Sequence, residues 1–266
     1  MQGGTEHRQL AFGASDELLG AGLIWPTDAQ RFRMDLVVAE AHRRRGVGTH
    51  LLGCLLEQAA RHGARTLQAR AAESNAVALS FLERHGFRET LRIHHFSLKA
   101  EQVNLAPDAE SRLVERGITI DSVVTELERT PDTYVRLAAV YDAASDEWPD
   151  PDPAPKRALS GDDVRAPCSN AGARFLDAVF IARAAGDYVG FTGLCVGGKS
   201  VGTAVRPAFR GLGVATALKR RLIRWAQAEQ VPQLHAANAH PAMVRLHRQL
   251  GFELAGIEVR LVRRLT

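Results

Sequence analysis

An internal repeat constrains the fold of this chain more than any other feature of its sequence. Residues 43–49 read RRRGVGT and residues 210–216 read RGLGVAT. Behind each glycine segment, apolar residues recur at every fourth position, which predicts one buried helical stripe in each copy. The aligned positions are Val47, Leu51, Leu55 and Ala59 in the first copy and Val214, Leu218, Leu222 and Ala226 in the second. The repeat therefore predicts two related domains.

The segments on either side of the glycine turns also correspond. After each helix we expect a short strand (66–71 and 233–237), then a second helix that ends at Gly86-Phe87 or Gly251-Phe252, then a β-rich tail (88–98 and 253–265). Before each turn we expect a three-stranded meander, over 9–14, 17–25 and 31–38 in the first copy and over 178–184, 188–196 and 199–205 in the second. Gly197-Gly198 predicts a two-residue hairpin turn.

The second copy has further elements ahead of its meander. The patterns predict a strand over 118–127, a helix over 131–144, a stiff acidic and proline-rich connection over 148–155, and a short helix that starts near Ser160. The first copy has only eight residues before its first strand, so we interpret it as truncated. We expect its open sheet edge to be covered by the second half or by another chain, which would make a homodimer.

We expect an α/β fold with mixed sheets, in which helices cover both faces of each sheet. The predicted divisions are a truncated domain over 1–105, a connecting helix over 106–116 that ends at Gly117, and a complete domain over 117–266.

Composition narrows the class of protein and its location. Apolar residues make up 45% and charged residues 24%, which is typical of a globular domain. The three cysteines are far apart and lack paired spacing, so we expect free thiols, no metal site and a reducing compartment. The sequence shows no signal peptide and no apolar run of membrane-spanning length, and we therefore expect a cytoplasmic protein without a membrane partner.

The glycine turn is suited to holding a diphosphate. Its glycines allow the backbone to approach a ligand, and the free N–H groups of the first helical turn and the helix dipole favour an anion. The neighbouring arginines add positive charge. A Walker loop is excluded because no Gly-Lys-Ser/Thr follows, and the dinucleotide fingerprint lacks its third glycine. Nucleic acid is the least favoured ligand, since the arginines gather at this turn and no aromatic-rich strand accompanies them.

These residues resemble the GCN5-related N-acetyltransferase (GNAT) superfamily, over about 31–98 and 117–266. The resemblance implies acetyl-CoA or another acyl-CoA as co-substrate, with its diphosphate at the turn and its pantetheine arm along the preceding strand. It also implies direct attack on the thioester by a primary amine of a small molecule or peptide. The cofactor-binding positions so implied are Ala204, Val205, Arg210, Gly211, Leu212, Gly213, Val214, Ala215 and Thr216, and in the first copy Val37, Val38, Arg43, Arg44, Arg45, Gly46, Val47, Gly48 and Thr49.

The catalytic groups follow the family pattern less closely. Where the resemblance implies a tyrosine that protonates the leaving thiolate, the first copy has Leu82 and the second has His247, which is our candidate acid. His235, at the end of the strand after the motif helix, is a further catalytic candidate. Asp35, Glu40, Asn238, Glu126 and Glu128 compete for the role of base. Proximity of the reactants without a dedicated acid–base pair is the remaining alternative.

Two functions remain open. In the first, the second copy is an N-acetyltransferase and the first copy is a structural or regulatory half. In the second, both copies bind acyl-CoA without catalysis, as a sensor or scaffold.

Overall fold

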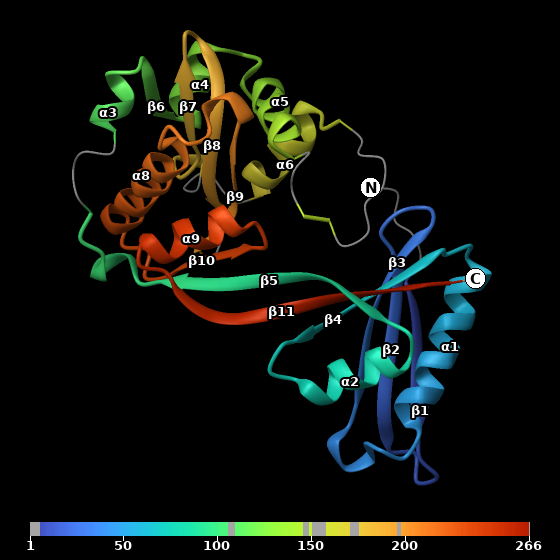
Figure 1. The fold of residues 1–266 in the computed structure, drawn as a ribbon. Helices are drawn as coiled ribbons and strands as arrows, with labels where there is room; N and C mark the ends of the chain where they lie inside the picture. The colour runs from blue at the N-terminus through green and yellow to red at the C-terminus, as the bar shows by residue number, and fades with distance from the viewer. Residues whose placement is uncertain are drawn as a thin grey trace. The chain divides into compact units, whose positions relative to one another are not determined.

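The structure is a computed structural model that describes residues 6–105, 110–145, 149–150, 158–170, 176–195 and 198–265 (Figure 1). The chain forms two compact units. Unit 1 comprises Met1–Ile93, Asp150–Pro153 and Ile257–Thr266, and unit 2 comprises His94–Pro149 and Ala154–Gly256.

Unit 1 is built on a mixed sheet. Its elements in chain order are β1 (His7–Phe12), β2 (Leu18–Pro26), β3 (Arg31–Val38), the short helix η1 (Glu40–His42), α1 (Val47–Arg61), β4 (Thr66–Ala72), α2 (Ala76–Arg84) and the start of β5 (Arg88–Leu98). The strand order is β1-β2-β3-β4-β11-β5, in which β3 and β4 are parallel and β1, β2 and β3 form an antiparallel meander.

Unit 2 repeats this arrangement with further elements in front. It contains η2 (Ala100–Gln102), α3 (Ser111–Val114), β6 (Ile118–Ser122), α4 (Val123–Arg129), α5 (Thr133–Ser145), α6 (Gly161–Asn170), β7 (Phe180–Ala184), β8 (Asp187–Cys195), β9 (Lys199–Val205), η5 (Pro207–Phe209), α8 (Val214–Ala228), β10 (Leu234–Asn238), α9 (Pro241–Gln249) and the start of β11 (Glu253–Arg264). Its strand order is β5-β10-β9-β8-β7-β6. A mixed α/β fold with two related halves is therefore confirmed.

The last strand of each copy passes from one unit into the other. In unit 2, β10 pairs with the end of β5, from Leu234 opposite Leu98 to Asn238 opposite His94. In unit 1, β4 pairs with the end of β11, from Thr66 opposite Arg264 to Ala72 opposite Glu258. Each unit is thus completed by a strand that belongs, in sequence, to the other copy.

The two parallel strands of each copy separate soon after they meet. β3 and β4 pair only over Arg31–Arg33 and Thr66–Gln68, after which β3 continues beside β2 and β4 continues beside β11. In unit 2, the single pair between β9 and β10 joins Lys199 and His235. The parting strands leave backbone N–H and C=O groups free along the facing edges, which a bound chain of amides can pair with.

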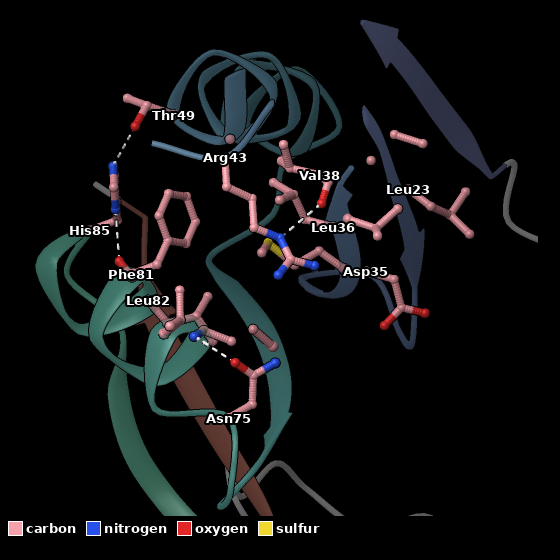
Figure 2. Close-up of a pocket in the computed structure, with 18 of the residues that line it drawn as sticks. Leu23, Asp35, Leu36, Val38, Arg43, Thr49, Asn75, Phe81, Leu82 and His85 are labelled. Carbon is pink, nitrogen blue, oxygen red and sulfur yellow. Dashed lines mark hydrogen bonds between the residues drawn. The ribbon is translucent and has the colours of Figure 1, made fainter. Parts of the chain in front are cut away.

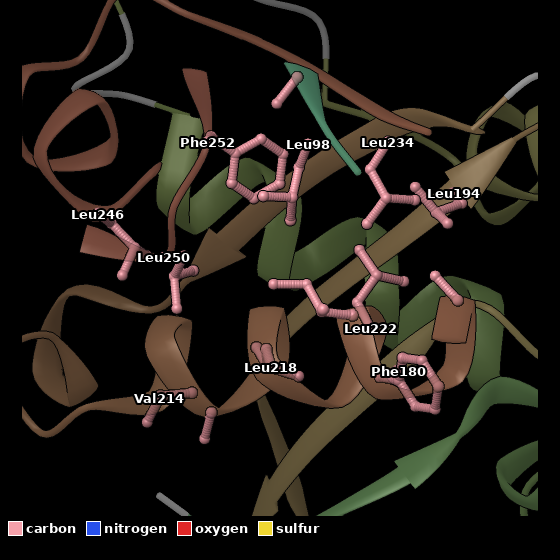
Figure 3. Close-up of a cluster of buried hydrophobic side chains, with 14 of the residues drawn as sticks. Leu98, Phe180, Leu194, Val214, Leu218, Leu222, Leu234, Leu246, Leu250 and Phe252 are labelled. Atoms are coloured by element: carbon pink, nitrogen blue, oxygen red, sulfur yellow. The ribbon is translucent and has the colours of Figure 1, made fainter. Parts of the chain in front are cut away.

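Unit 2 has a hydrophobic core on each face of its sheet. The larger core packs α8 and α9 against the sheet through residues such as Leu218, Leu222 and Leu246 (Figure 3). The second core packs α4 and α5 against the opposite face through Val123, Leu137 and Tyr188.

Unit 1 differs because its described helices share one core. Leu52 and Leu55 of α1 and Leu82 of α2 pack with Phe32 and Leu67 of the sheet. We expected helices on both faces of each sheet, and this holds for unit 2. In unit 1, Leu10, Leu18 and Val37 are 57%, 52% and 61% exposed, whereas Ile181, Tyr188 and Ala204, at the matching positions of unit 2, are buried.

Most expected elements are present, with the boundaries of β3, β5 and β9 as predicted. The strand expected over 118–127 is wrong beyond Ser122, because the Ser122 hydroxyl accepts a hydrogen bond from the backbone N–H of Thr125 and starts α4. The helix expected near Ser160 is present, and Ser160 and Asp163 cap it reciprocally.

Several predictions fall partly outside the described residues. The connecting helix over 106–116 is described only as α3, Ser111–Val114. The proline-rich connection over 148–155 lies outside the described residues except for 149 and 150, and of the Gly197-Gly198 turn only Gly198 is described. None of the described helices combines the length and the apolar character that crossing a membrane requires.

Candidate active site

The two glycine turns have the same backbone geometry. Gly46 and Gly213, the residues that precede α1 and α8, have φ angles of +85° and +91°, and neither helix start has a side-chain cap. Arg44 and Gly211 occupy a second left-handed position, with φ angles of +62° and +75°. The first-turn N–H groups therefore face outward without a competing side chain, as an anion site requires.

The first arginine of each turn folds back onto the preceding strand. Arg43 Nε donates to the Val38 carbonyl at 3.1 Å, and Arg210 Nε donates to the Val205 carbonyl at 3.2 Å. In unit 2, Arg210 also donates through Nη2 to the Ala144 carbonyl on α5 at 3.4 Å. The same charge is thus fixed beside both turns, and in unit 2 it is also tied to α5.

A cavity of about 830 Å³ lies in unit 1 at its glycine turn. Its walls come from β1, β2, β3, β4, the turn, the start of α1 and one side of α2, and it includes the region where β3 and β4 part. Of the cofactor-binding residues expected in the first copy, it brings together Val37, Val38, Arg43, Arg44, Gly46, Gly48 and Thr49, whereas Arg45 and Val47 are not among its lining residues. Its volume is in the range of ligand pockets.

Hydrogen bonds fix the α2 side of this cavity (Figure 2). The Asn75 side chain caps α2 by accepting from the Ala78 N–H at 3.0 Å. His85 Nδ1 lies 2.7 Å from the Phe81 carbonyl, and its Nε2 lies 3.2 Å from the Thr49 hydroxyl at the start of α1. Because the carbonyl can only accept, Nδ1 donates this hydrogen bond.

Asp35 is the single acidic residue among those that line the cavity. Its carboxylate lies 3.6 Å from Arg70 Nε and is about half exposed. Leu82, at the position where a thiolate acid was sought, also lines the cavity and is 5% exposed. The cavity is therefore lined by a proton acceptor, Asp35 on β3, and by an apolar side chain, Leu82 on α2.

His247, our candidate acid, is a core residue in this structure. Its side chain is 1% exposed and packs between Phe96 and Phe252, with ring-centre distances of 5.3 and 5.0 Å. Burial and the nearby Lys219 lower the pKa of His247 from 6.5 to about 3. The imidazole is therefore neutral near pH 7, and this geometry does not support the role of an acid.

Lys219 is a second buried polar group in the same core. It is 2% exposed, and its Nζ donates to the Ser200 hydroxyl at 3.0 Å. Burial lowers the pKa of Lys219 from 10.5 to about 8. Lys219 and His247 occupy the positions that Leu52 and Leu82 occupy in the first copy.

The remaining candidates have structural partners or lie apart from the cavity. His235 is exposed on β10, where it pairs with Ser97 and Lys199. Asn238 accepts from the His240 N–H at 2.8 Å, and His240 caps α9. Glu126 is fully buried and accepts from Arg129, Arg183 and the Tyr188 hydroxyl at 2.8, 3.1 and 2.8 Å. Glu40 and Glu128 are exposed and do not line the cavity.

The expected second-copy cofactor residues keep the turn geometry but differ in exposure. Ala204 and Val214 are buried, whereas Arg210, Gly211, Leu212 and Gly213 are exposed and Val205, Ala215 and Thr216 are half-buried.

Sequence reasoning missed Arg8, Arg70 and Arg84, which line the first-copy cavity. For Arg70, the available signal was an arginine on an expected strand that follows a strand with arginines at alternate positions, Arg31 and Arg33.

The repeated strand, glycine turn and helix, together with parting parallel strands, define a two-copy α/β protein whose two turns share the same left-handed, uncapped geometry. The family model described as "Acetyltransferase (GNAT) family" matches residues 4–87 and 137–252. Since these matches cover more than half of the chain, the protein belongs to the GNAT acetyltransferase family.

Solved structures support the same fold over the full length. A GCN5-related N-acetyltransferase from Sphaerobacter thermophilus is 19% identical with a TM-score of 0.75, covering 97% of this chain and 80% of that chain. A tandem GNAT protein from the clavulanic acid biosynthesis pathway is 19% identical with a TM-score of 0.65, covering 99% and 84%. A glucosamine N-acetyltransferase region of a fungal multi-domain GH3 beta-N-acetylglucosaminidase is 13% identical with a TM-score of 0.75, covering 98% of this chain but 33% of that chain. No curated protein sequence matches this chain.

Proposed function

We propose that the protein is an acyl-CoA-dependent N-acetyltransferase that transfers an acetyl group to a primary amine, and that the first copy carries the reaction. The observation that supports this most directly is the cavity of about 830 Å³ at the first glycine turn. Membership of an acetyltransferase family supports the reaction class.

The residues of this cavity suit an acyl-CoA. Arg43, Arg44 and the uncapped N–H groups at Gly46–Thr49 would hold the diphosphate. The unpaired edge of β3 near Val37 and Val38 would hydrogen-bond the amides of the pantetheine arm.

The choice of copy departs from our expectation from the sequence, which favoured the second copy. In unit 2, the position of the expected acid is a buried, neutral imidazole, and Arg210 is engaged by the end of α5. In unit 1, the corresponding region opens into the large cavity and contains Asp35. These differences favour chemistry in the first copy.

The bound acyl-CoA would supply the thioester acyl group. A protonated amine is not a nucleophile, and Asp35 would accept its proton, directly or through water, as the C–N bond forms and the C–S bond breaks. Water would return a proton to the departing thiolate, since Leu82 has no proton to donate. The cleft orients the two reactants along the free edge of β3.

The alternative is a non-catalytic acyl-CoA sensor or scaffold. It is favoured by the lack of a proton donor at Leu82. Acetyl-CoA binding without release of CoA over a panel of primary amines would support this alternative and contradict the proposed reaction.

The two glycine turns provide a matched experiment. Gly46→Glu and Gly213→Glu each place a carboxylate at a left-handed residue with no neighbouring atom within 4 Å of the new Cβ. The backbone strain, roughly 1–2 kcal/mol, and the added charge are therefore the same in both variants. We expect Gly46→Glu to abolish acetyl-CoA-dependent thiol release and Gly213→Glu to retain most of it.

Calorimetric binding of acetyl-CoA and thermal unfolding of both variants should be measured beside the rates. Loss of thiol release in Gly213→Glu but not in Gly46→Glu, with both variants folded, would assign the reaction to the second copy. Asp35→Asn tests the base and should reduce kcat by about 10²-fold or more at neutral pH, with acetyl-CoA binding unchanged.

A further inference from the structure

Arginines from three strands meet on one face of the unit 1 sheet. Arg33 on β3 lies opposite Gln68 on β4, and Arg70, two residues further along β4, lies opposite Arg260 on β11. Residues that lie opposite one another or two apart on a strand share a face of the sheet. The pairing therefore brings Arg33, Arg70 and Arg260 together with Asp35, which is two residues beyond Arg33.

The carboxylates on this face do not balance the arginines. Arg260 Nε donates to Glu258 at 3.0 Å, and Arg70 lies 3.6 Å from Asp35 and 3.9 Å from Glu258. Arg33 Nε donates to the neutral Gln68 side chain at 3.3 Å, and within the described part of the chain no carboxylate lies in ion-pair contact with it. Burial, Arg260 and Arg70 together lower the pKa of Arg33, as expected of a guanidinium held among like charges.

The fold does not require this cluster, because the second copy lacks it. Arg33, Asp35, Arg70 and Arg260 correspond to Ser200, Gly202, Ala237 and His95 when the two copies are aligned at their glycine turns and Gly-Phe segments. Ala237 lies opposite His95 just as Arg70 lies opposite Arg260, so the comparison holds in the strand pairing as well. Three guanidinium groups at one site of one copy carry an electrostatic cost that a ligand can offset.

The cluster adjoins the large cavity at the point where β3 and β4 part. A smaller cavity of about 70 Å³ is lined by Arg33, Arg70 and Arg260 and shares Met34, Asp35, Ala69 and Arg70 with the large one. The arginines therefore lie beside Asp35, the proposed proton acceptor. Arg43 and Arg44 lie at the glycine turn, beyond the end of β3, so the diphosphate does not account for this second group of positive charges.

We propose that the acceptor is an amine that also carries a carboxylate, and that Arg33, flanked by Arg70 and Arg260, binds this carboxylate. The proposal rests on the proposed acyl transfer in the first copy and specifies its substrate class. A planar guanidinium can donate two parallel hydrogen bonds to a carboxylate, which fixes the orientation as well as the position of the acceptor. The amine then faces Asp35, and the acceptor is a free amino acid or an acidic peptide.

Paired acceptors test the proposal in the full-length protein. L-Lysine and L-lysinamide share the same ε-amine, and a carboxamide replaces the α-carboxylate in the second. The C-terminally amidated dipeptides Ala-Asp and Ala-Asn share the same α-amine, and a carboxamide replaces the side-chain carboxylate in the second. We expect kcat/KM for the carboxylate member of at least one pair to exceed that of the amide member by about tenfold or more. The pair that discriminates identifies the acceptor as a free amino acid or as a peptide.

Substitutions assign the effect to Arg33. Arg33→Gln should raise KM for the carboxylate acceptor by about tenfold or more and leave kcat/KM for the amide unchanged. Arg33→Lys keeps the charge but loses the paired geometry, and should give an intermediate KM. Arg61→Gln, on the exposed end of α1 beside Glu57, removes the same charge elsewhere in unit 1 and should leave both acceptors unchanged.

Binding separates a failure of this proposal from a failure of the proposed reaction. Calorimetric titration of L-lysine, L-lysinamide and both dipeptides into the protein with CoA needs no turnover. Carboxylate-dependent binding that Arg33→Gln abolishes would support the proposal even if no amine is acetylated. Equal affinities and equal rates within every pair, or weaker acetyl-CoA binding as the main effect of Arg33→Gln, would overturn it.

Discussion

Replacement of His247 by leucine should make the protein more stable, and more so as the pH falls. His247 is 1% exposed, and neither ring nitrogen has a hydrogen-bond partner among the described residues. A buried polar group without a partner costs about 1–3 kcal/mol. Leucine is the residue that the first copy has at this position, where Leu82 is 5% exposed in an intact core. We therefore expect His247→Leu to raise the free energy of unfolding by about 1–3 kcal/mol at pH 8.

The pH dependence follows from the shift of the His247 pKa. Burial and Lys219 lower this pKa from 6.5 to about 3, so between these values the unfolded chain binds a proton that the folded chain does not. Stability is full above about pH 6.5 and is lost as the pH falls towards 3, by about 1.4 kcal/mol per pH unit. At pH 5 the wild-type protein should therefore have lost about 2 kcal/mol that His247→Leu retains.

Urea unfolding of both proteins between pH 5 and 8 measures this difference, because contributions from all other titrating groups largely cancel. His235→Leu, which removes an exposed histidine from the same unit, is the matched control. Parallel stability curves for the wild type and His247→Leu over this pH range would refute the reasoning. A variant that is less stable than the wild type at pH 8 would show that the imidazole has a partner in solution.

Two further substitutions test buried charges in unit 2. Lys219→Leu should raise the free energy of unfolding by about 3 kcal/mol at pH 7. Burial lowers the pKa of Lys219 from 10.5 to about 8, so the wild-type protein loses stability as the pH falls from 10.5 to 8, and the leucine variant does not. Urea midpoints of both proteins at pH 7 and 10 measure this difference. Glu126→Gln should lower the free energy of unfolding by about 1.5–3 kcal/mol, because the hydrogen bonds from Arg129 and Arg183 lose their buried carboxylate while both guanidinium groups remain partly exposed to water. The same urea assay measures the loss, and an unchanged midpoint would contradict the structural role of Glu126.

Local signals in the sequence were sufficient for most elements of the fold. Glycine turns, apolar spacing and Gly-Phe helix ends are short-range features, and they predicted β3, α1, α8 and the second helices close to their observed bounds. The strand expected to reach Leu127 failed for a local reason as well. The serine cap at Ser122 favours a helix start, and it overrode the alternating pattern that suggested a longer strand.

Strand pairing between the copies could not be predicted from the repeat. Two equivalent tails, β5 and β11, have similar patterns, and nothing local indicates which strand each will accompany. The pairing of β4 with β11 joins residues nearly 200 positions apart, such as Arg70 and Arg260. The arginine cluster depends on this pairing, so its members looked like isolated surface charges in the sequence.

The two copies diverge in their polar residues, and this divergence bears on function more than their common fold does. In the first copy, Leu52 and Leu82 belong to an apolar core. Asp35 and Arg70 line both the large cavity and the smaller one beside it, and Arg33 lines the smaller one. In the second copy, the matching core positions hold Lys219 and His247, while the matching sheet positions hold Ser200, Gly202 and Ala237. Burial of the Lys219 amine and of the His247 imidazole, which has no hydrogen-bond partner among the described residues, reduces stability, whereas charges that converge on an open cleft recognise ligands. A search for the reaction should therefore begin in the first copy, although the second copy has the more complete set of secondary-structure elements.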